Sequence, residues 1–293
     1  MFILFIAKMP PYVTRAKKII YFLFFIGLTF PLIALSQDSQ EFFESGNNKR
    51  DQGDYLGSIN DYDKAISIDS NNHIYYSNRG VLKYEIGKYK GAIADYTQAL
   101  LIEPVFSDAY FNRGNAFRKT GAYNKAIEDY TKTLEIIGND ISALNNRAIS
   151  YTKLGRLSKA IVDYNQLLLI DSDYAIGYNN RGNLKYLLGD IDGAISDYNK
   201  AIKFNPNNHL IYYNIANLKS VKGDSFAAIR DYNKVLKLNP MYLVAYKKRA
   251  EEKYKLADFG AACTDWKQAI GLGDRDLSKW LTSNEGQWCR LLS

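Results

Sequence analysis

Apolar and polar positions recur along most of the chain in a fixed pattern. A small residue marks a chain reversal at constant spacing, at Gly53, Gly87, Gly121, Gly155, Gly189, Gly223 and Ala257. An aspartate followed by an aromatic residue comes eight or nine residues later in every period: Asp61-Tyr62, Asp95-Tyr96, Asp129-Tyr130, Asp163-Tyr164, Asp197-Tyr198, Asp231-Tyr232 and Asp265-Trp266. Apolar residues keep helical spacing on both sides of the reversal, which predicts two helices of about 13–14 residues in each period.

The periods place small residues where two helices must approach. With Ser39 as the first residue, the repeats run 39–72, 73–106, 107–140, 141–174, 175–208, 209–242 and 243–276. Position 8 of every repeat is Gly or Ala, and position 20 is Ala in all but the first, which has Ser58. One helix pair cannot bury its apolar face alone, so the pairs must stack. We expect the position-24 tyrosines to lie in this core with their hydroxyls at its rim, which accounts for the high tyrosine content of the chain.

The 34-residue helix–turn–helix period resembles that of the tetratricopeptide repeat (TPR) family, and the resemblance covers residues 39–276. The sequence departs from the family pattern at position 32, where only three repeats have proline: Pro104, Pro206 and Pro240. The resemblance implies an all-α, right-handed superhelical solenoid of antiparallel helix pairs. We expect residues 277–293 to form a C-terminal cap that covers the last open face.

In TPR proteins the first helices of successive repeats line a concave groove in which partners bind. Carried over to this chain, the groove positions predict a peptide-binding set: Tyr84, Asn115, Arg118, Lys119, Asn145, Lys153, Asn179, Asn183, Tyr186 and Asn217. An asparagine amide can donate to a peptide backbone and accept from it, and the basic residues of the middle repeats could bind a carboxylate. The alternative is that asparagine is only a soluble residue on an exposed face.

Two further rows of polar residues follow the period. Position 6 is asparagine in five repeats, at Asn78, Asn112, Asn146, Asn180 and Asn214, where we expect structural hydrogen bonds between repeats rather than ligand binding. Position 7 is arginine in five repeats, at Arg79, Arg113, Arg147, Arg181 and Arg249, and position 23 is always aspartate. We predict that these Arg and Asp residues pair between neighbouring helices as a charged ladder. The alternatives are a row of solvated surface charges or an arginine row that binds anions.

The first 36 residues have the features of a secretory signal. Arg15, Lys17 and Lys18 precede an apolar stretch from Ile19 to Leu35, and small residues precede a cleavage site after Ser36. The alternative is an uncleaved membrane anchor, because 17 apolar residues lie at the lower limit for spanning a bilayer. We therefore expect an exported protein, in the periplasm, at the cell envelope or outside the cell. Cys263 and Cys289 are the only cysteines, and in such a compartment they favour a disulfide over two buried thiols.

Composition argues against catalysis and against nucleic acid. The net charge is +7, but four basic residues and no acidic ones precede residue 37, which leaves 34 basic against 31 acidic residues in a cleaved chain. The histidines, His73 and His209, each open a repeat after an Asn-Asn pair, where we expect exposed helix starts with a structural role. No metal-ligand cluster, phosphate loop or nucleophile elbow is present, so we expect no cofactor, no metal and no enzymatic activity.

These observations predict an exported TPR scaffold that binds a protein or peptide partner in its groove. Membrane association is expected only if the N-terminal segment is uncleaved, in which case the protein would be a tethered assembly scaffold at the envelope. The alternative of another class is an RNA-binding helical repeat, which the near-balanced charge of the cleaved chain disfavours.

Overall fold

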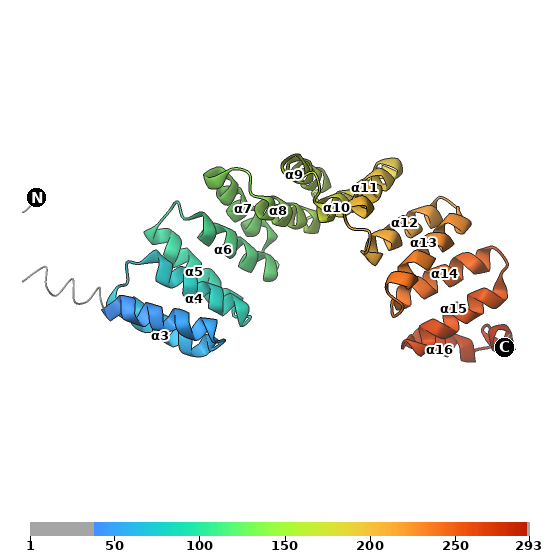
Figure 1. The fold of residues 1–293 in the computed structure, drawn as a ribbon, viewed down its shortest axis with the longest axis horizontal. Coiled ribbons are helices and arrows are strands. Elements are labelled where there is room, and N and C mark those ends of the chain that lie inside the picture. The colour runs from blue at the N-terminus through green and yellow to red at the C-terminus, as the bar shows by residue number, and fades with distance from the viewer. Residues whose placement is uncertain (1–37, 292–293) are drawn as a thin grey trace, which may run out of the picture. The chain divides into compact units, whose positions relative to one another are not determined.

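The computed structural model describes residues 38–291, and the regular structure in this range is helical, without strands (Figure 1). The chain divides between Gly138 and Asn139 into two compact units, here called the first and the second unit. A helix spans residues 38–51, and it is followed by α3 (Tyr55–Ile68), α4 (His73–Glu85), α5 (Tyr89–Ile102), α6 (Ser107–Lys119), α7 (Tyr123–Ile137), α8 (Ile141–Lys153), α9 (Leu157–Ile170), α10 (Ala175–Leu187), α11 (Ile191–Phe204), α12 (His209–Val221), α13 (Ser225–Leu238), α14 (Leu243–Lys255), α15 (Phe259–Gly271), α16 (Arg275–Thr282) and α17 (Gln287–Leu291).

The helices form consecutive pairs. In each unit a first helix packs against the second helix of its own repeat, as in α4 with α5 and α10 with α11, and that second helix packs against the first helix of the next repeat. From α4 to α14, successive first helices begin one full sequence period apart. Figure 1 shows the pairs following one another along each unit. The predicted all-helical architecture of sequential helix pairs is confirmed.

A residue with a positive φ angle reverses the chain inside each pair. Gly87 has φ 77°, and the N–H of the following Lys88 donates to the carbonyl of Lys83 at 2.7 Å, which closes the end of α4. This left-handed conformation suits glycine because it has no Cβ. Ala257 adopts it too, with φ 58°, and is the only non-glycine residue in the described range with a positive φ.

Asparagine and aspartate side chains cap the helix starts. Asn72 accepts a hydrogen bond from the N–H of Ile74 at 3.1 Å, and Asn208 accepts one from Leu210 at 3.0 Å. The Asn-Asn pairs before the two histidines are therefore helix caps. His73 packs edge-on against Phe106, and His209 lies 3.2 Å from the Asn239 amide, so both histidines are half-buried contacts between repeats rather than exposed helix starts.

The position-24 tyrosines fill the space between paired helices. Tyr62, Tyr96, Tyr130, Tyr164, Tyr198 and Tyr232 are each at most 2% exposed. Their rings lie directly on the small residues of position 8: a Cβ added to Gly80 would lie 2.8 Å from Cε1 of Tyr96, and one added to Gly182 would lie 2.8 Å from Cε1 of Tyr198. The close approach predicted for position 8 is confirmed, and it explains why this position has no larger side chain.

The predicted Arg–Asp ladder is also confirmed within each unit. Each position-7 arginine donates two hydrogen bonds to the position-23 aspartate of the same repeat, as Arg181 does to Asp197 at 2.8 and 2.7 Å. The five pairs are Arg79–Asp95, Arg113–Asp129, Arg147–Asp163, Arg181–Asp197 and Arg249–Asp265. The Arg181 side chain is 14% exposed and that of Asp197 only 2%, so these charges are not solvated surface charges.

The ladder has two further features that the sequence analysis did not predict. A third N–H group of the arginine reaches back to position 25 of the preceding repeat, where Arg181 donates to Asn165 at 2.7 Å and Arg249 to Asn233 at 2.6 Å. A lysine at position 11 supplies a second cation in some repeats, such as Lys185, 2.9 Å from Asp197. Because these guanidinium groups already bind protein acceptors, the structure gives no support to an anion-binding role for the row.

A disulfide holds the C-terminal end of the second unit. Cys263 of α15 is joined to Cys289 of α17, with 5.5 Å between their Cα atoms, and both cysteines are fully buried. Two short helices, α16 and α17, follow α15, and α16 begins at Arg275, two residues before the boundary predicted for the cap. Its N-cap Asp274 accepts a hydrogen bond from the Leu277 N–H at 2.9 Å.

The predicted signal segment, residues 1–36, lies outside the described residues, so it stays a prediction. Among residues 38–291, no helix is both long and apolar enough to traverse a bilayer.

Candidate functional site

The strongest candidate for the predicted groove is a pocket of about 280 Å³ between α10 and α12 in the second unit. It brings together three residues of the predicted binding set, Asn183, Tyr186 and Asn217. Leu187, Tyr198, Asn214 and Leu218 complete its lining. Asn183 and Asn217 occupy the same position of successive repeats, so helical periodicity places both amides on one face of the stacked first helices.

The asparagines of this pocket are held by buried tyrosines. The Tyr198 hydroxyl donates to Oδ1 of Asn183 at 2.6 Å, and the Tyr232 hydroxyl donates to Oδ1 of Asn217 at 2.6 Å. The first unit has the same bonds, from Tyr62 to Asn47 at 2.7 Å and from Tyr130 to Asn115 at 2.7 Å. This contact crosses the helix pair, and it fixes the rotamer of each asparagine.

Protonation of the tyrosines fixes the direction of these bonds. Burial raises the pKa of Tyr198 and of Tyr232, and it raises the pKa of Tyr130 to about 12, although a hydrogen bond with Arg118 opposes this rise. The hydroxyls therefore remain donors throughout the physiological pH range, and the asparagine oxygen is their acceptor. The Asn217 oxygen thus accepts one hydrogen bond from the protein, and the Asn183 oxygen accepts a second from Asn214, so the dual role of the amide stays a prediction.

The amide N–H groups remain available in this pocket. Within residues 38–291, the Nδ2 groups of Asn183 and Asn217 make no hydrogen bond to the protein. The pocket therefore offers N–H donors from two successive repeats beside the apolar surfaces of Leu187 and Leu218. Such an arrangement suits acceptors spaced along an extended chain, such as peptide carbonyls.

Asn214 connects the two repeats that form the pocket. Its Nδ2 donates to Oδ1 of Asn179 at 3.0 Å and to Oδ1 of Asn183 at 3.2 Å. The structural role predicted for the position-6 row is confirmed at this residue. Asn146 and Asn180 each accept a hydrogen bond from the asparagine that precedes them, at 3.4 Å, and Asn180 also interacts with Tyr164 of the preceding repeat. Asn214 also lines the pocket, which the sequence analysis did not predict.

The other predicted binding residues are distributed over both units. Tyr84 on α4 packs edge-on against Tyr89, and burial raises its pKa. On α6, Lys119 is exposed, whereas Nε of Arg118 is buried and has no hydrogen-bond partner in the described structure.

Two predicted residues lie on α8 in the second unit. Lys153 is exposed, and Oδ1 of Asn145 is buried without a hydrogen-bond partner in the described structure. Arg118 and Lys119 belong to the first unit, so the carboxylate site predicted from these two residues and Lys153 remains a prediction.

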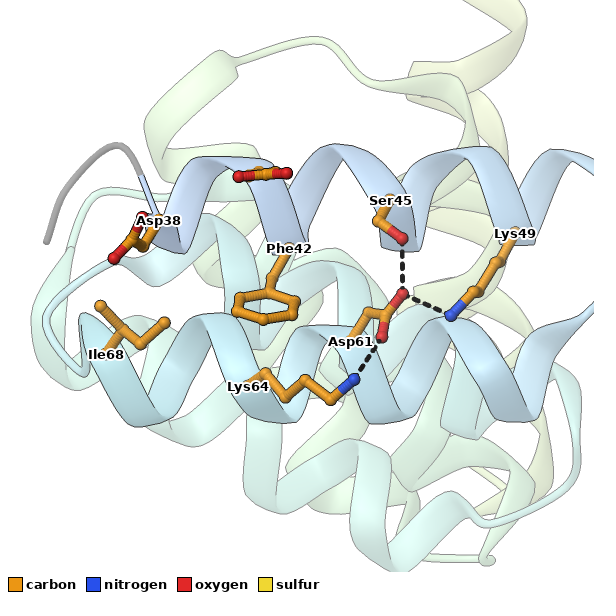
Figure 2. Close-up of a pocket in the computed structure, with 8 residues that line it drawn as sticks. Asp38, Phe42, Ser45, Lys49, Asp61, Lys64 and Ile68 are labelled. Carbon is orange, nitrogen blue, oxygen red and sulfur yellow. Dashed lines mark hydrogen bonds and ion pairs between the residues drawn. The ribbon is translucent and has the colours of Figure 1, made fainter. Parts of the chain in front are cut away.

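A second hollow, of about 540 Å³, lies in the first repeat. Figure 2 shows Ser45, Lys49 and Lys64 directed at the carboxylate of Asp61, with distances of 2.7, 2.6 and 3.1 Å. Burial alone would raise the pKa of Asp61, but these three hydrogen bonds outweigh it and lower the pKa to about 2. Ser45 occupies the position of the ladder arginine, so the hollow is the space that its shorter side chain leaves. The three groups around Asp61 are bonded to its carboxylate, which indicates a structural feature.

In residues 38–291, no group of three or more His, Cys, Asp or Glu residues is arranged to hold a metal ion.

The fold has several similar solved structures, and their sequence identities are so low that the likeness is one of fold alone. A tetratricopeptide repeat protein from Parabacteroides merdae has 22% identity and a TM-score of 0.64, over 87% of this chain and 99% of that one. The C-terminal part of a TPR repeat-containing protein from Cytophaga hutchinsonii has 18% identity and a TM-score of 0.68, over 82% and 100%. YrrB, described as a TPR protein with an unusual peptide-binding site, has 20% identity and a TM-score of 0.55, over 63% and 95%.

Sequence comparison identifies the family directly. Among curated proteins, no relative matches the sequence of the chain. Models of the TPR repeat match residues 46–87, 82–121, 150–189 and 182–220, and models of the tetratricopeptide repeat match residues 107–140 and 210–241. These matches span most of the described helix pairs, and the chain belongs to the tetratricopeptide repeat family.

Proposed function

We propose that this protein is an exported, non-catalytic adaptor that binds a peptide segment of a partner protein on the face of its first helices. The observation that carries the proposal is the pocket between α10 and α12, where the amide N–H groups of Asn183 and Asn217 have no protein acceptor. An extended peptide offers carbonyl oxygens along its backbone, so it could accept hydrogen bonds from consecutive repeats. The TPR fold and the likeness to YrrB, which is described as having an unusual peptide-binding site, support the same function.

The conformation of the asparagines favours tight binding. A side chain that must lose rotamer freedom on binding reduces affinity by about 0.5–1.5 kcal/mol. The Tyr198 and Tyr232 hydroxyls already hold these two amides in one orientation, so little of that entropy remains to be lost. Backbone recognition of this kind would tolerate variation in the peptide sequence, with the exposed Leu187 as an apolar contact.

An isosteric substitution tests the proposal. Asn217→Asp keeps the acceptor for the Tyr232 hydroxyl but removes the amide donor. Peptides selected on the purified protein from a random display library should bind this variant roughly tenfold more weakly, as expected for the loss of one hydrogen bond beside a new negative charge. Asn47→Asp is the matched control, because Asn47 accepts the same bond from Tyr62 but does not line the pocket. Equal binding to the wild-type protein and to both variants would refute the proposal.

We also propose that the protein is exported, which rests on the signal-like residues 1–36. N-terminal sequencing of the protein isolated from its cells tests this. A first residue of Gln37 would support a cleaved, exported adaptor. Retention of residues 1–36 in a membrane fraction would instead support the tethered scaffold, and recovery of the uncleaved protein from the cytoplasm would refute export.

A further inference from the structure

A second pocket, here called the aromatic pocket, lies at the C-terminal end of the second unit and has a volume of about 540 Å³. It is lined by Trp266, Trp280 and Trp288, which are the only three tryptophans of the chain, together with Tyr254, Glu251 and Glu285. Glu251 and Tyr254 stand on α14 at the groove positions of the last repeat, equivalent to Asn183 and Tyr186. The aromatic pocket is therefore built on the same face of the first helices as the proposed peptide site.

The three indole rings stand nearly perpendicular to one another. Trp266 lies 5.0 Å from Trp280 with an interplanar angle of 67°, and 6.1 Å from Trp288 at 72°. Trp280 and Trp288 are 6.2 Å apart at 77°. Each of the three is only partly buried, so these rings do not merely fill a core, and part of each remains accessible to a ligand.

The disulfide and local ring contacts hold the aromatic side chains of this pocket in place. Trp266 follows Cys263 by three residues on α15, and Trp288 directly precedes Cys289 on α17, so the disulfide fixes two of the three indoles to each other. The Tyr254 ring lies 5.8 Å from Trp266 and 6.0 Å from Trp288. A pre-organised aromatic pocket needs little rearrangement to bind a ligand.

The charges around the pocket leave one carboxylate available. Glu251 pairs with Lys248 at 2.8 Å, and the rim residue Lys255 pairs with the buried Glu252 at 2.6 Å. Glu285 is exposed and forms no ion pair within the described residues. A cation in the pocket would therefore meet a carboxylate that has no counter-ion.

Aromatic faces elsewhere in the molecule already carry cations. The guanidinium carbon of Arg181 lies 5.5 Å from the ring centre of Tyr178, and Arg79, Arg113 and Arg249 stack on the position-4 tyrosines of their own repeats in the same way. The aromatic partners in such contacts are tyrosine and phenylalanine throughout the described residues, and the three indoles are not among them. Tryptophan has the strongest attraction for cations of the three ring types, yet here its faces have no cation.

We propose that the aromatic pocket binds an arginine side chain of the partner protein, an inference that rests on the proposed peptide-binding function. A guanidinium group is flat and can stack on an indole face while its N–H groups donate to Glu285. A quaternary ammonium ion could contact the rings, but it has no donor for that carboxylate. Lysine has a donor but no plane to stack, so arginine fits both features of the pocket.

The tryptophans themselves report binding, because all of them line this pocket. The purified protein is titrated with the tryptophan-free peptide acetyl-Gly-Arg-Gly-amide and its fluorescence is recorded. The same peptide with citrulline, a neutral isostere of arginine, is the matched control, and a lysine peptide and choline are the other probes. We expect a saturable change with arginine, and affinity for citrulline that is weaker by roughly threefold to thirtyfold.

Two variants test the assignment. Glu285→Gln should weaken arginine binding roughly threefold to tenfold at low salt, since Glu285 is exposed and its replacement leaves no buried charge. Trp280→Phe retains a ring but should weaken the cation–π contact. Equal affinity for arginine and citrulline, choline binding as tight as arginine binding, or no saturable change with any probe would overturn the inference.

The outcomes separate this inference from the proposed function. Library-selected peptides that need Asn217 but contain no arginine would uphold the peptide site and overturn the arginine site. Arginine binding by a protein whose library selection yields no Asn217-dependent peptide would refute the proposed groove and keep the pocket as a binding site of its own.

Discussion

Two repeats of the ladder differ in how many cations face the buried aspartate, and this difference should determine the effect of removing the arginine. Asp129 is 4% exposed and is bound by Arg113 alone, at 2.8 Å in both hydrogen bonds, because Phe117 stands where five of the six other repeats have lysine. Asp197 is also buried, and it is bound by both Arg181 and Lys185.

The pKa directions of the two carboxyls agree with this count. Burial raises the pKa of Asp129, and the hydrogen bonds from Arg113 do not offset it. Burial also acts to raise the pKa of Asp197, but the hydrogen bonds and charges of Arg181 and Lys185 outweigh it, so the pKa is lowered. Asp129 therefore depends on its single arginine more than Asp197 does.

Arg113→Ala leaves a buried carboxylate without a cation, a change that typically costs about 3–5 kcal/mol of folding free energy. Arg181→Ala leaves Lys185 in place, so its cost should be closer to that of lost charged hydrogen bonds, about 1.5–3 kcal/mol. Hydrogen exchange of α7 and α11 measures the two losses locally, which matters because repeat arrays can open one segment at a time.

Removal of the aspartate charge is the control for this argument. Arg113→Ala combined with Asp129→Asn should recover most of the lost protection, since no buried charge then remains. The defect of Arg113→Ala should also diminish as the pH falls through the raised pKa of Asp129, because protonation neutralises the same group. A larger loss for Arg181→Ala than for Arg113→Ala, or no recovery in the double variant, would refute the reasoning.

Three further predictions concern single features of the chain. Asp61, with its pKa lowered to about 2, should stabilise the protein fully above about pH 4. The difference in urea midpoint between wild type and Asp61→Asn should therefore shrink as the pH falls toward 2. A difference that stays constant would contradict this prediction. Ala257→Gly should raise the free energy of unfolding of the second unit, followed by thermal denaturation, by about 1 kcal/mol, because Ala257 has φ 58°. Gly223→Ala, where φ is 82°, should lower this free energy by a similar amount. Reduction of the Cys263–Cys289 bond should lower the stability of the C-terminal end by about 3.5 kcal/mol. Hydrogen exchange over residues 259–291 should then be faster under reducing conditions. Unchanged exchange would argue against a structural role of the bond.

The periodic part of the fold could be predicted from the sequence because every repeat has the same pattern of apolar, small and charged positions. The 34-residue spacing located the helix pairs, and the recurring slots for Arg and Asp predicted the ladder that the structure shows. Repetition compensates for the ambiguity of any one helix, since a chance apolar run does not return in phase.

The candidate sites were only partly predictable, for two physical reasons. Asn183 and Tyr198 lie on different helices, so only the packing of the pair shows that the tyrosine occupies the asparagine oxygen. Trp280 and Trp288 lie after the last repeat, where no period constrains the chain, and they meet Trp266 through the disulfide and the turn between α16 and α17. The confinement of all three tryptophans to the end of the chain, from Trp266 onward, was the only available signal for the aromatic pocket.

The hydrogen bonds that Arg181 and Arg249 donate to the preceding repeat give the array a direction. Arg249 depends on Asn233 and Arg181 on Asn165, and in each case the partner belongs to the repeat before. A repeat deleted at the C-terminal side of such a stack takes its own arginine with it, whereas a repeat deleted at the N-terminal side leaves the next arginine with an unused donor. Ser45, the residue at this position in the first repeat, needs no acceptor of that kind. Within a stack, the outermost contact of these arginines therefore depends on the repeat before it and not on the repeat after it.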